Sequence, residues 1–135
     1  MTSTELKSRA KNYAHRCIKL SMALPKTILG NYIAGQLIRS SLSVAANYRA
    51  ACLAQSKKEF ASKISIVLEE ADESLFWIEM VGDEKVLETE KLLPIKQESE
   101  ELTKIFAASR ITVRSKEKSK PNPKSKPILN KPIPN

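Results

Sequence analysis

The spacing of apolar residues constrains this chain more than any other feature of its sequence, because most of them recur every three or four positions. The first such series comprises Leu6, Ala10, Tyr13, Cys17, Leu20 and Leu24. This spacing places one apolar stripe along an α-helix. Pro25 ends the series, since the residue before a proline is pushed out of the α-helical region. The pattern predicts a helix over residues 4–23.

A second helix is indicated over residues 31–54 by two stripes of different character. The first stripe is apolar or small and comprises Ile33, Leu37, Ser41, Val44 and Tyr48. The second holds only small or short polar residues, namely Ser40, Ser43, Asn47, Ala50 and Ala54. A face of small residues allows another helix to approach closely. This helix is therefore expected to be buried on more than one side.

A local capping signal precedes the third helix. Ser56, followed by two lysines and Glu59, matches the capping box. In that motif the serine hydroxyl accepts from the amide of Glu59, and the glutamate side chain accepts from the amide of Ser56. The apolar series that follows comprises Phe60, Ile64, Val67, Leu68, Ala71, Leu75 and Ile78. Gly82 is a suitable stop for this helix.

Pro94 interrupts the fourth segment. Residues 86–92 are expected to form two helical turns. Pro94 would then occupy the first position of a longer helix, where its missing amide costs nothing. Leu102, Ile105 and Phe106 continue the apolar series to about Val113. A short helix followed by a longer one is therefore predicted.

The composition agrees with a helical fold. Only three glycines occur among 135 residues, and Leu, Ile, Ala, Glu and Lys, which favour helices, dominate. We therefore predict an all-α, antiparallel up-down four-helix bundle over residues 1–114. Residues 115–135 hold five of the seven prolines and six lysines. Such a segment buries too little apolar surface to offset the entropy of ordering, so a disordered C-terminal tail is predicted.

The formal charge of +8 is distributed unevenly. Residues 1–63 carry +9, residues 64–114 carry −6, and residues 115–135 carry +5. A basic first half and an acidic second half would complement each other when the helices pair. The remaining positive charge favours a polyanionic partner such as RNA or DNA.

The residues needed for known catalytic or metal sites are missing. The single histidine, His15, excludes the paired Glu-x-x-His motifs of di-iron bundles. Cys17 and Cys52 lack zinc-site spacing, and no glycine-rich phosphate loop occurs. The acidic run Glu69, Glu70, Asp72 and Glu73 is better interpreted as a solvated face, or as one that pairs with the basic helices, than as a metal site. We expect no enzymatic activity, cofactor or metal.

The two cysteines and the lack of a long apolar run indicate the cellular compartment of the protein. Cys17 and Cys52 lie in apolar helical surroundings and are interpreted as reduced thiols. The N-terminus has no apolar run typical of a signal peptide. No stretch approaches the roughly 20 apolar residues needed to span a bilayer. A cytoplasmic protein without a membrane partner is expected.

Basic residues are the remaining candidates for function. The hypothesis is that a set of them contacts phosphates, although display to solvent is the simpler interpretation of any single one. The candidates are Lys7, Lys11, Lys19, Arg49, Lys57 and Lys58. Lys57 and Lys58 stand at a helix N-terminus, where cations oppose the macrodipole. Structural or interface roles are assigned to Ser40, Ser43, Asn47, Ser56, Glu59 and Trp77.

Three segments carry a resemblance to a known family. They are residues 39–52 (RSSLSVAANYRAAC), 56–60 (SKKEF) and 69–79 (EEADESLFWIE). They resemble the small four-helix bundle proteins encoded in intervening sequences of bacterial 23S rRNA genes. The chain departs from that pattern at Ala50, Ala51 and Ala54. The resemblance implies assembly into a five-membered ring. It also implies a relationship to the accessory proteins of diversity-generating retroelements. Those proteins bind RNA or DNA, and they also bind the reverse transcriptase of the retroelement.

Two functions follow as hypotheses. The first is a homo-oligomeric, non-enzymatic bundle, a pentamer by resemblance, that binds structured RNA or another nucleic acid through its basic surface. The second is an adaptor that docks on a partner enzyme such as a reverse transcriptase.

Overall fold

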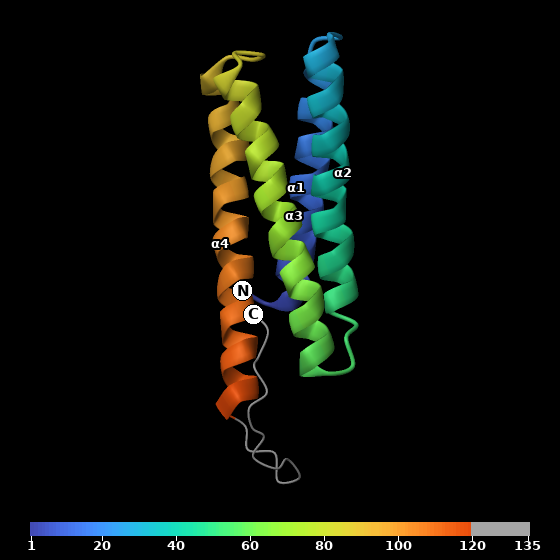
Figure 1. Ribbon diagram of the computed structural model, residues 1–135, viewed down its shortest axis with the longest axis vertical. Helices are drawn as coiled ribbons and strands as arrows, with labels where there is room; N and C mark the ends of the chain where they lie inside the picture. The colour runs from blue at the N-terminus through green and yellow to red at the C-terminus, as the bar shows by residue number, and fades with distance from the viewer. Residues whose placement is uncertain (120–135) are drawn as a thin grey trace.

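The computed structural model describes residues 1–119, and residues 120–135 of the predicted tail lie outside this range. Four helices run alternately up and down: α1 (Ser3–Ala23), α2 (Ile28–Ala51), α3 (Lys57–Asp83) and α4 (Thr89–Ser119) (Figure 1). The predicted all-α four-helix bundle is confirmed. α4 continues to Ser119, past the boundary predicted at residue 114.

The starts of α1 and α3 show how local side chains fix helix ends. The Thr2 hydroxyl accepts from the amide of Glu5 at 3.1 Å, and the Glu5 carboxylate accepts from the amide of Thr2 at 3.1 Å. This capping box was readable as Thr-x-x-Glu but was not predicted. At α3, the Ser56 hydroxyl accepts from the amide of Glu59 at 3.0 Å, as predicted.

The second half of the predicted α3 capping box is wrong. The Glu59 carboxylate accepts from the amide of Gln55 at 3.0 Å, one residue before the expected partner. Ser56 is the N-cap, with extended backbone. Glu59 therefore ties α3 to the connection that precedes it rather than to the cap residue itself.

α2 begins and ends three residues earlier than predicted, because Thr27 rather than Gly30 marks its start. The Thr27 hydroxyl accepts from the amide of Gly30 at 3.0 Å, which places Gly30 inside the first turn. The chain passes very close here: a Cβ added to Gly30 would lie 2.0 Å from the carbonyl oxygen of Pro25. Only glycine fits this position without a backbone shift.

Residues 84–88 connect α3 to α4, so the short helix predicted at residues 86–92 does not form as a separate element, and its residues 89–92 are the first turn of α4. The amide of Lys85 donates to the carbonyl of Gly82 at 3.0 Å, and that of Val86 to the carbonyl of Val81 at 2.9 Å. With Lys85 at φ 56°, these bonds form a Schellman motif. The bonds end α3 and carry the chain directly into α4.

The predicted break at Pro94 is also wrong, because α4 is one helix that contains Pro94 near its beginning. Inside a helix a proline loses one backbone hydrogen bond and its ring crowds the carbonyl four residues earlier, which together cost about 3 kcal/mol. Leu92 and Ile95 on either side of it are buried in the core. Burial of a large aliphatic side chain contributes about 1.5–3 kcal/mol, so the two together offset the cost of the proline.

The core fills the space between all four helices. Its largest side chains include Phe106, which is fully buried and lies with its ring centroid 5.5 Å from that of Tyr48. A smaller apolar cluster lies where α1 meets α2 and α3 meets α4, and comprises Leu24, Ile33, Val81 and Leu92. α2 packs against both α1 and α3, and α3 packs against α4. None of the described helices combines the length and apolarity needed to cross a membrane.

Polar contacts join α1 to the second half of the chain. Arg9 on α1 pairs with Glu98 at 2.7 Å and Glu101 at 3.0 Å on α4. The Tyr13 hydroxyl lies 2.7 Å from both Ser74 on α3 and Ser99 on α4, and all three side chains are buried. One tyrosine therefore links three helices through hydrogen bonds inside the core.

Candidate nucleic-acid interface

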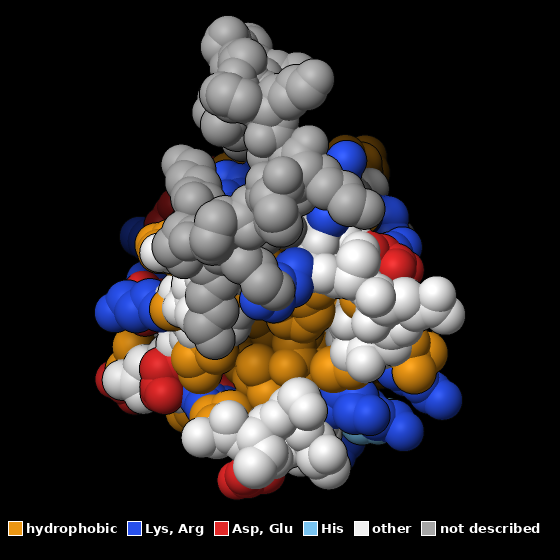
Figure 2. All heavy atoms as spheres, turned by 90° about the horizontal axis from the view of Figure 1, so that it is seen from below, with side chains coloured by type: hydrophobic (Ala, Val, Ile, Leu, Met, Phe, Trp, Pro, Cys, Tyr) orange, Lys and Arg blue, Asp and Glu red, His pale blue; other side chains and the backbone are white. Residues whose placement is uncertain are grey.

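A groove of about 470 Å³ runs between α1 and α2. Its apolar lining comes from Ala14 on α1 and from Leu42, Ala45 and Ala46 on α2. Its polar lining comes from Lys7, Ser8, Lys11, His15 and Arg49. Because α1 and α2 are antiparallel, the beginning of α1 lies beside the end of α2, which brings Lys7 and Arg49 to one groove. Figure 2 views the lower end of the bundle and shows Lys and Arg side chains gathered at its lower right.

The groove unites three of the six predicted phosphate contacts. Lys7, Lys11 and Arg49 are exposed, and none has a carboxylate partner among the described side chains, which are those of residues 1–115. Arg9 and Arg39 behave differently, because the structure pairs each of them with two glutamates. The positive charge of the groove is therefore left uncompensated while neighbouring arginines are neutralised.

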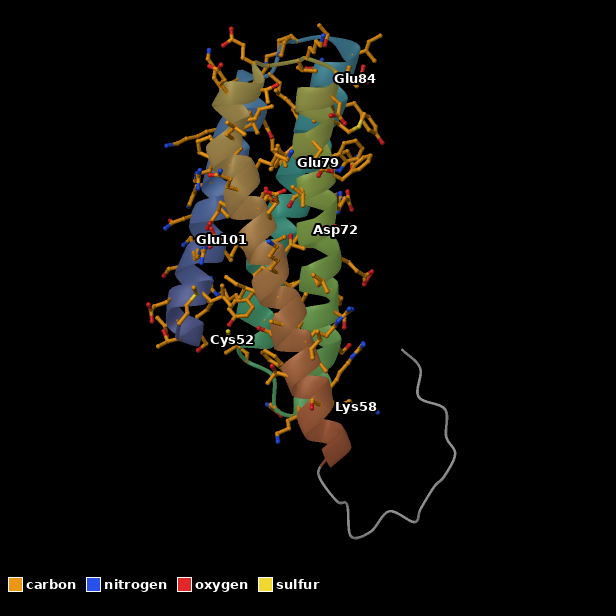
Figure 3. The ribbon with its side chains drawn as sticks, turned by 90° about the vertical axis from the view of Figure 1, so that its left-hand side faces the viewer. Cys52, Lys58, Asp72, Glu79, Glu84 and Glu101 are labelled. Carbon is orange, nitrogen blue, oxygen red and sulfur yellow. The ribbon has the colours of Figure 1, made fainter. Side chains whose placement is uncertain are left out.

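The other three predicted contacts lie elsewhere. Lys19 is exposed on α1 but does not line the groove. Lys57 and Lys58 stand at the first turn of α3, and Figure 3 shows Lys58 at the lower end of that helix (Figure 3). Neither lysine lines the groove between α1 and α2.

The predicted structural residues are placed as follows. Ser40 is fully buried, and its hydroxyl donates to the carbonyl of Gln36 at 2.8 Å. The Asn47 amide donates to the Ser43 hydroxyl at 2.9 Å, which makes these two residues a pair within α2. Ser56 and Glu59 serve the start of α3 as described above.

Trp77 is half-buried on α3. Its ring contacts Tyr32 and Phe76, and its indole N–H donates to the Glu73 carboxylate at 3.0 Å. This hydrogen bond, together with Arg39, holds the pKa of Glu73 below its ordinary value.

The acidic run on α3 pairs with a basic helix. Arg39 on α2 contacts Glu70 at 3.2 Å and also pairs with Glu73. Across the described part of the chain, no three His, Cys, Asp or Glu side chains are grouped as a metal site requires. The ion pairs of Glu70 and Glu73 with Arg39 therefore agree with the prediction that the acidic face of α3 pairs with a basic helix.

Sequence reasoning missed two sets of residues. The apolar α2 lining of the groove, Leu42, Ala45 and Ala46, carried a signal, since these residues lie within two helical turns of the predicted Arg49 on one side of the helix. The hydrogen bonds of Tyr13 with Ser74 and Ser99 carried none, because those residues come from three separate helices.

Burial in the core raises the pKa values of two α1 side chains, Cys17 and Tyr13. It raises the pKa of the Cys17 thiol to about 12, against the opposing effect of hydrogen bonds with Tyr13 and Ser41. It also raises the pKa of Tyr13 well above its ordinary value. Both side chains stay protonated at neutral pH.

The helix order and contacts define an up-down four-helix bundle with a cationic groove. The model of the 23S rRNA-intervening sequence proteins matches residues 3–108, and the chain belongs to this family. The confirmed family agrees with the resemblance noted from the sequence. A search of curated proteins gave no significant match.

A similar solved structure comes from Bacteroides thetaiotaomicron VPI-5482. It is a crystal structure of a protein with unknown function from the S23 ribosomal protein family. The two chains are 27% identical with a TM-score of 0.73, and the match covers 82% of this chain and 98% of that one.

Proposed function

We propose that this protein is a non-enzymatic homo-oligomer that binds structured RNA or another nucleic acid along the groove between α1 and α2. The observation that carries the proposal is the gathering of Lys7, Lys11 and Arg49 around one groove, without a carboxylate partner among the side chains of residues 1–115. Cations placed in this way neutralise phosphates and release counterions. The name of the family, which refers to an rRNA sequence, makes RNA the first ligand to test.

The chemistry of the groove favours contacts with the sugar-phosphate backbone. Its lining contains no Phe, Tyr or Trp, and the imidazole of His15 is the one ring on which a base could stack. Its apolar surface is made by one leucine and small alanines, which leave room for a strand to lie between the cations. Contacts of this kind position a nucleic acid without reading its sequence.

Self-association is the second part of the proposal. Large apolar side chains away from the groove support it, since Leu53 is 75% exposed and Ile111 is 66% exposed. Analytical ultracentrifugation of the full chain tests this part separately. A monomer at all concentrations would remove the oligomer from the proposal and leave the groove unaffected.

The binding prediction concerns the salt dependence of affinity. The variant Lys7→Ala/Lys11→Ala/Arg49→Ala is expected to bind a structured RNA more weakly and to lower the slope of log K against log salt by about 2–3, because each phosphate contact contributes about 0.7–0.9. Fluorescence anisotropy of a labelled RNA hairpin at several salt concentrations measures the slope, and a DNA duplex of equal length tests the type of nucleic acid.

A matched control removes the same charge elsewhere. Lys26, Lys91 and Lys104 are exposed and lie outside the groove, so their triple alanine variant should keep most of the slope. Lys57→Ala/Lys58→Ala tests whether the contact surface extends to α3. Equal losses in the groove and control variants, or binding that does not respond to salt, would refute the groove. A chain that captured a partner protein but no nucleic acid would instead favour the adaptor function.

A further inference from the structure

An exposed aromatic patch lies across α2 and α3, on a different face from the groove. We define it by Tyr32, Phe76 and Trp77. The Trp77 ring makes edge contacts with both neighbours, at centroid distances of 5.7 Å to Tyr32 and 4.9 Å to Phe76. Tyr32 is 57% exposed and Phe76 is 48% exposed. Three joined rings with this much free surface are well suited to bind another apolar group.

Acidic side chains border the aromatic patch along α3. Asp72 lies one turn before Phe76 and Glu79 lies one turn after it, both on the exposed side of the helix. Figure 3 labels both on α3. Neither has a cationic partner among the described residues, whereas Glu73 is held by Arg39 and Trp77. The patch therefore combines exposed rings with free negative charge.

The sequence of residues 120–135 has the opposite character. It contains four lysines, five prolines and no acidic residue. It also repeats one short motif: Lys-Pro-Ile occurs at residues 126–128 and again at 131–133. Proline-rich segments favour the polyproline II conformation, which aromatic grooves bind at low entropic cost. The lysines complement the acids that border the patch.

The length of this segment is sufficient for an intramolecular contact. α4 ends at the same end of the bundle at which α3 begins (Figure 1). α4 runs about 45 Å from Thr89 to Ser119, and Phe76 lies about 10 Å from the other end of the bundle along α3, so about 34 Å separates the end of α4 from the level of Phe76 at about 1.5 Å per residue. Residues 120–133 span about 43 Å in polyproline II at about 3.1 Å per residue. The second Lys-Pro-Ile motif can therefore reach the patch from the end of α4.

We propose that the Lys-Pro-Ile segment of residues 126–133 docks in cis on the aromatic patch. Its prolines and isoleucines cover Tyr32, Phe76 and Trp77, and its lysines pair with Asp72 and Glu79. A tethered segment has an effective concentration of about 1 mM, so it occupies its site about half of the time even when its intrinsic Kd is also about 1 mM. Docking thus needs only weak contacts.

Trp77, the sole tryptophan of the chain, reports directly on this contact. The test measures quenching of its fluorescence by acrylamide, an uncharged quencher, in the full-length protein without nucleic acid. The tail variant Ile128→Ser/Ile133→Ser is expected to raise the quenching constant by up to about two-fold, since it frees a patch that is about half occupied. Asp72→Asn/Glu79→Gln should raise it in the same direction, as should added salt.

Two further measurements make the result decisive. The control variant Ile111→Ser replaces an exposed isoleucine of α4 outside the patch and should leave the quenching constant unchanged. Dilution should also leave it unchanged if the contact is intramolecular. The proposal is overturned if the tail variant quenches like the wild type. It is equally overturned if dilution exposes Trp77, because a second copy of the chain would then cover the patch.

Discussion

Replacing Gly30 with alanine is expected to lower the free energy of unfolding by about 2–3 kcal/mol. The new Cβ would lie 2.0 Å from the carbonyl oxygen of Pro25 and 3.1 Å from the Thr27 hydroxyl oxygen. That carbonyl accepts from the amide of Thr27 at 2.9 Å, and the hydroxyl caps α2 through the Gly30 amide. Relief of the clash therefore disturbs both hydrogen bonds that shape the connection between α1 and α2.

Gly35 on the same helix provides the matched control. A Cβ added there meets no atom within 4 Å. Gly35→Ala is therefore expected to stabilise the protein by about 0.5–1 kcal/mol, because alanine loses less backbone entropy in a helix. Urea unfolding followed by far-UV circular dichroism measures both variants. Equal stabilities of the two would contradict the close contact described at Pro25.

The second large effect is a loss of stability at alkaline pH. The unfolded Cys17 thiol ionises from about pH 9.0, whereas burial raises its pKa to about 12 in the folded protein. Unfolded Tyr13 ionises from about pH 10.0, and burial raises its folded pKa further still. Above these values the unfolded chain has released protons that the folded protein retains. The free energy of unfolding then falls with pH by up to about 1.4 kcal/mol per pH unit for each group.

Substitutions at the tyrosines separate this effect from general alkaline damage. Tyr13→Phe removes one ionising group and should reduce the decline above pH 10.0. At neutral pH it should cost about 1–2 kcal/mol, since Ser99 loses its hydroxyl partner in the core. Tyr32→Phe, at an exposed tyrosine, is the matched control for the loss of one hydroxyl. Urea unfolding at a series of pH values is the measurement, and identical slopes for both variants would contradict the role of Tyr13.

The sequence was sufficient for the four-helix bundle and for the approximate positions of α1, α2 and α3, because each apolar stripe marks one buried face. The ends of the helices were harder to predict from the sequence. Thr27 and Gly30 compete as the boundary of α2, and only the close approach of Pro25 shows that Gly30 lies inside the helix. Pro94 has a known local cost, but the burial of Leu92 and Ile95 that outweighs it depends on packing between helices.

The candidate site was predictable in part for a geometric reason. Lys7 and Lys11 are one turn apart and share a face of α1. Continuing in steps of four to Lys19 rotates the side chain by about 40° per step in a helix of about 3.6 residues per turn. Lys19 therefore leaves the face that Lys7 defines. Arg49 joins the groove only because α2 returns beside α1, which no local pattern reveals.

The separation of charge between faces has a kinetic consequence. Free cations line the groove between α1 and α2, while the free acids Asp72 and Glu79 border the aromatic patch on α3. These opposite charges on two faces form a local electric dipole. In the field of a polyanion such a dipole turns the groove toward the ligand before contact and raises the rate of productive encounter. Glutamates pair with Arg9 and Arg39 and leave the cations of the groove unpaired. This difference determines which face of the bundle a polyanion would approach.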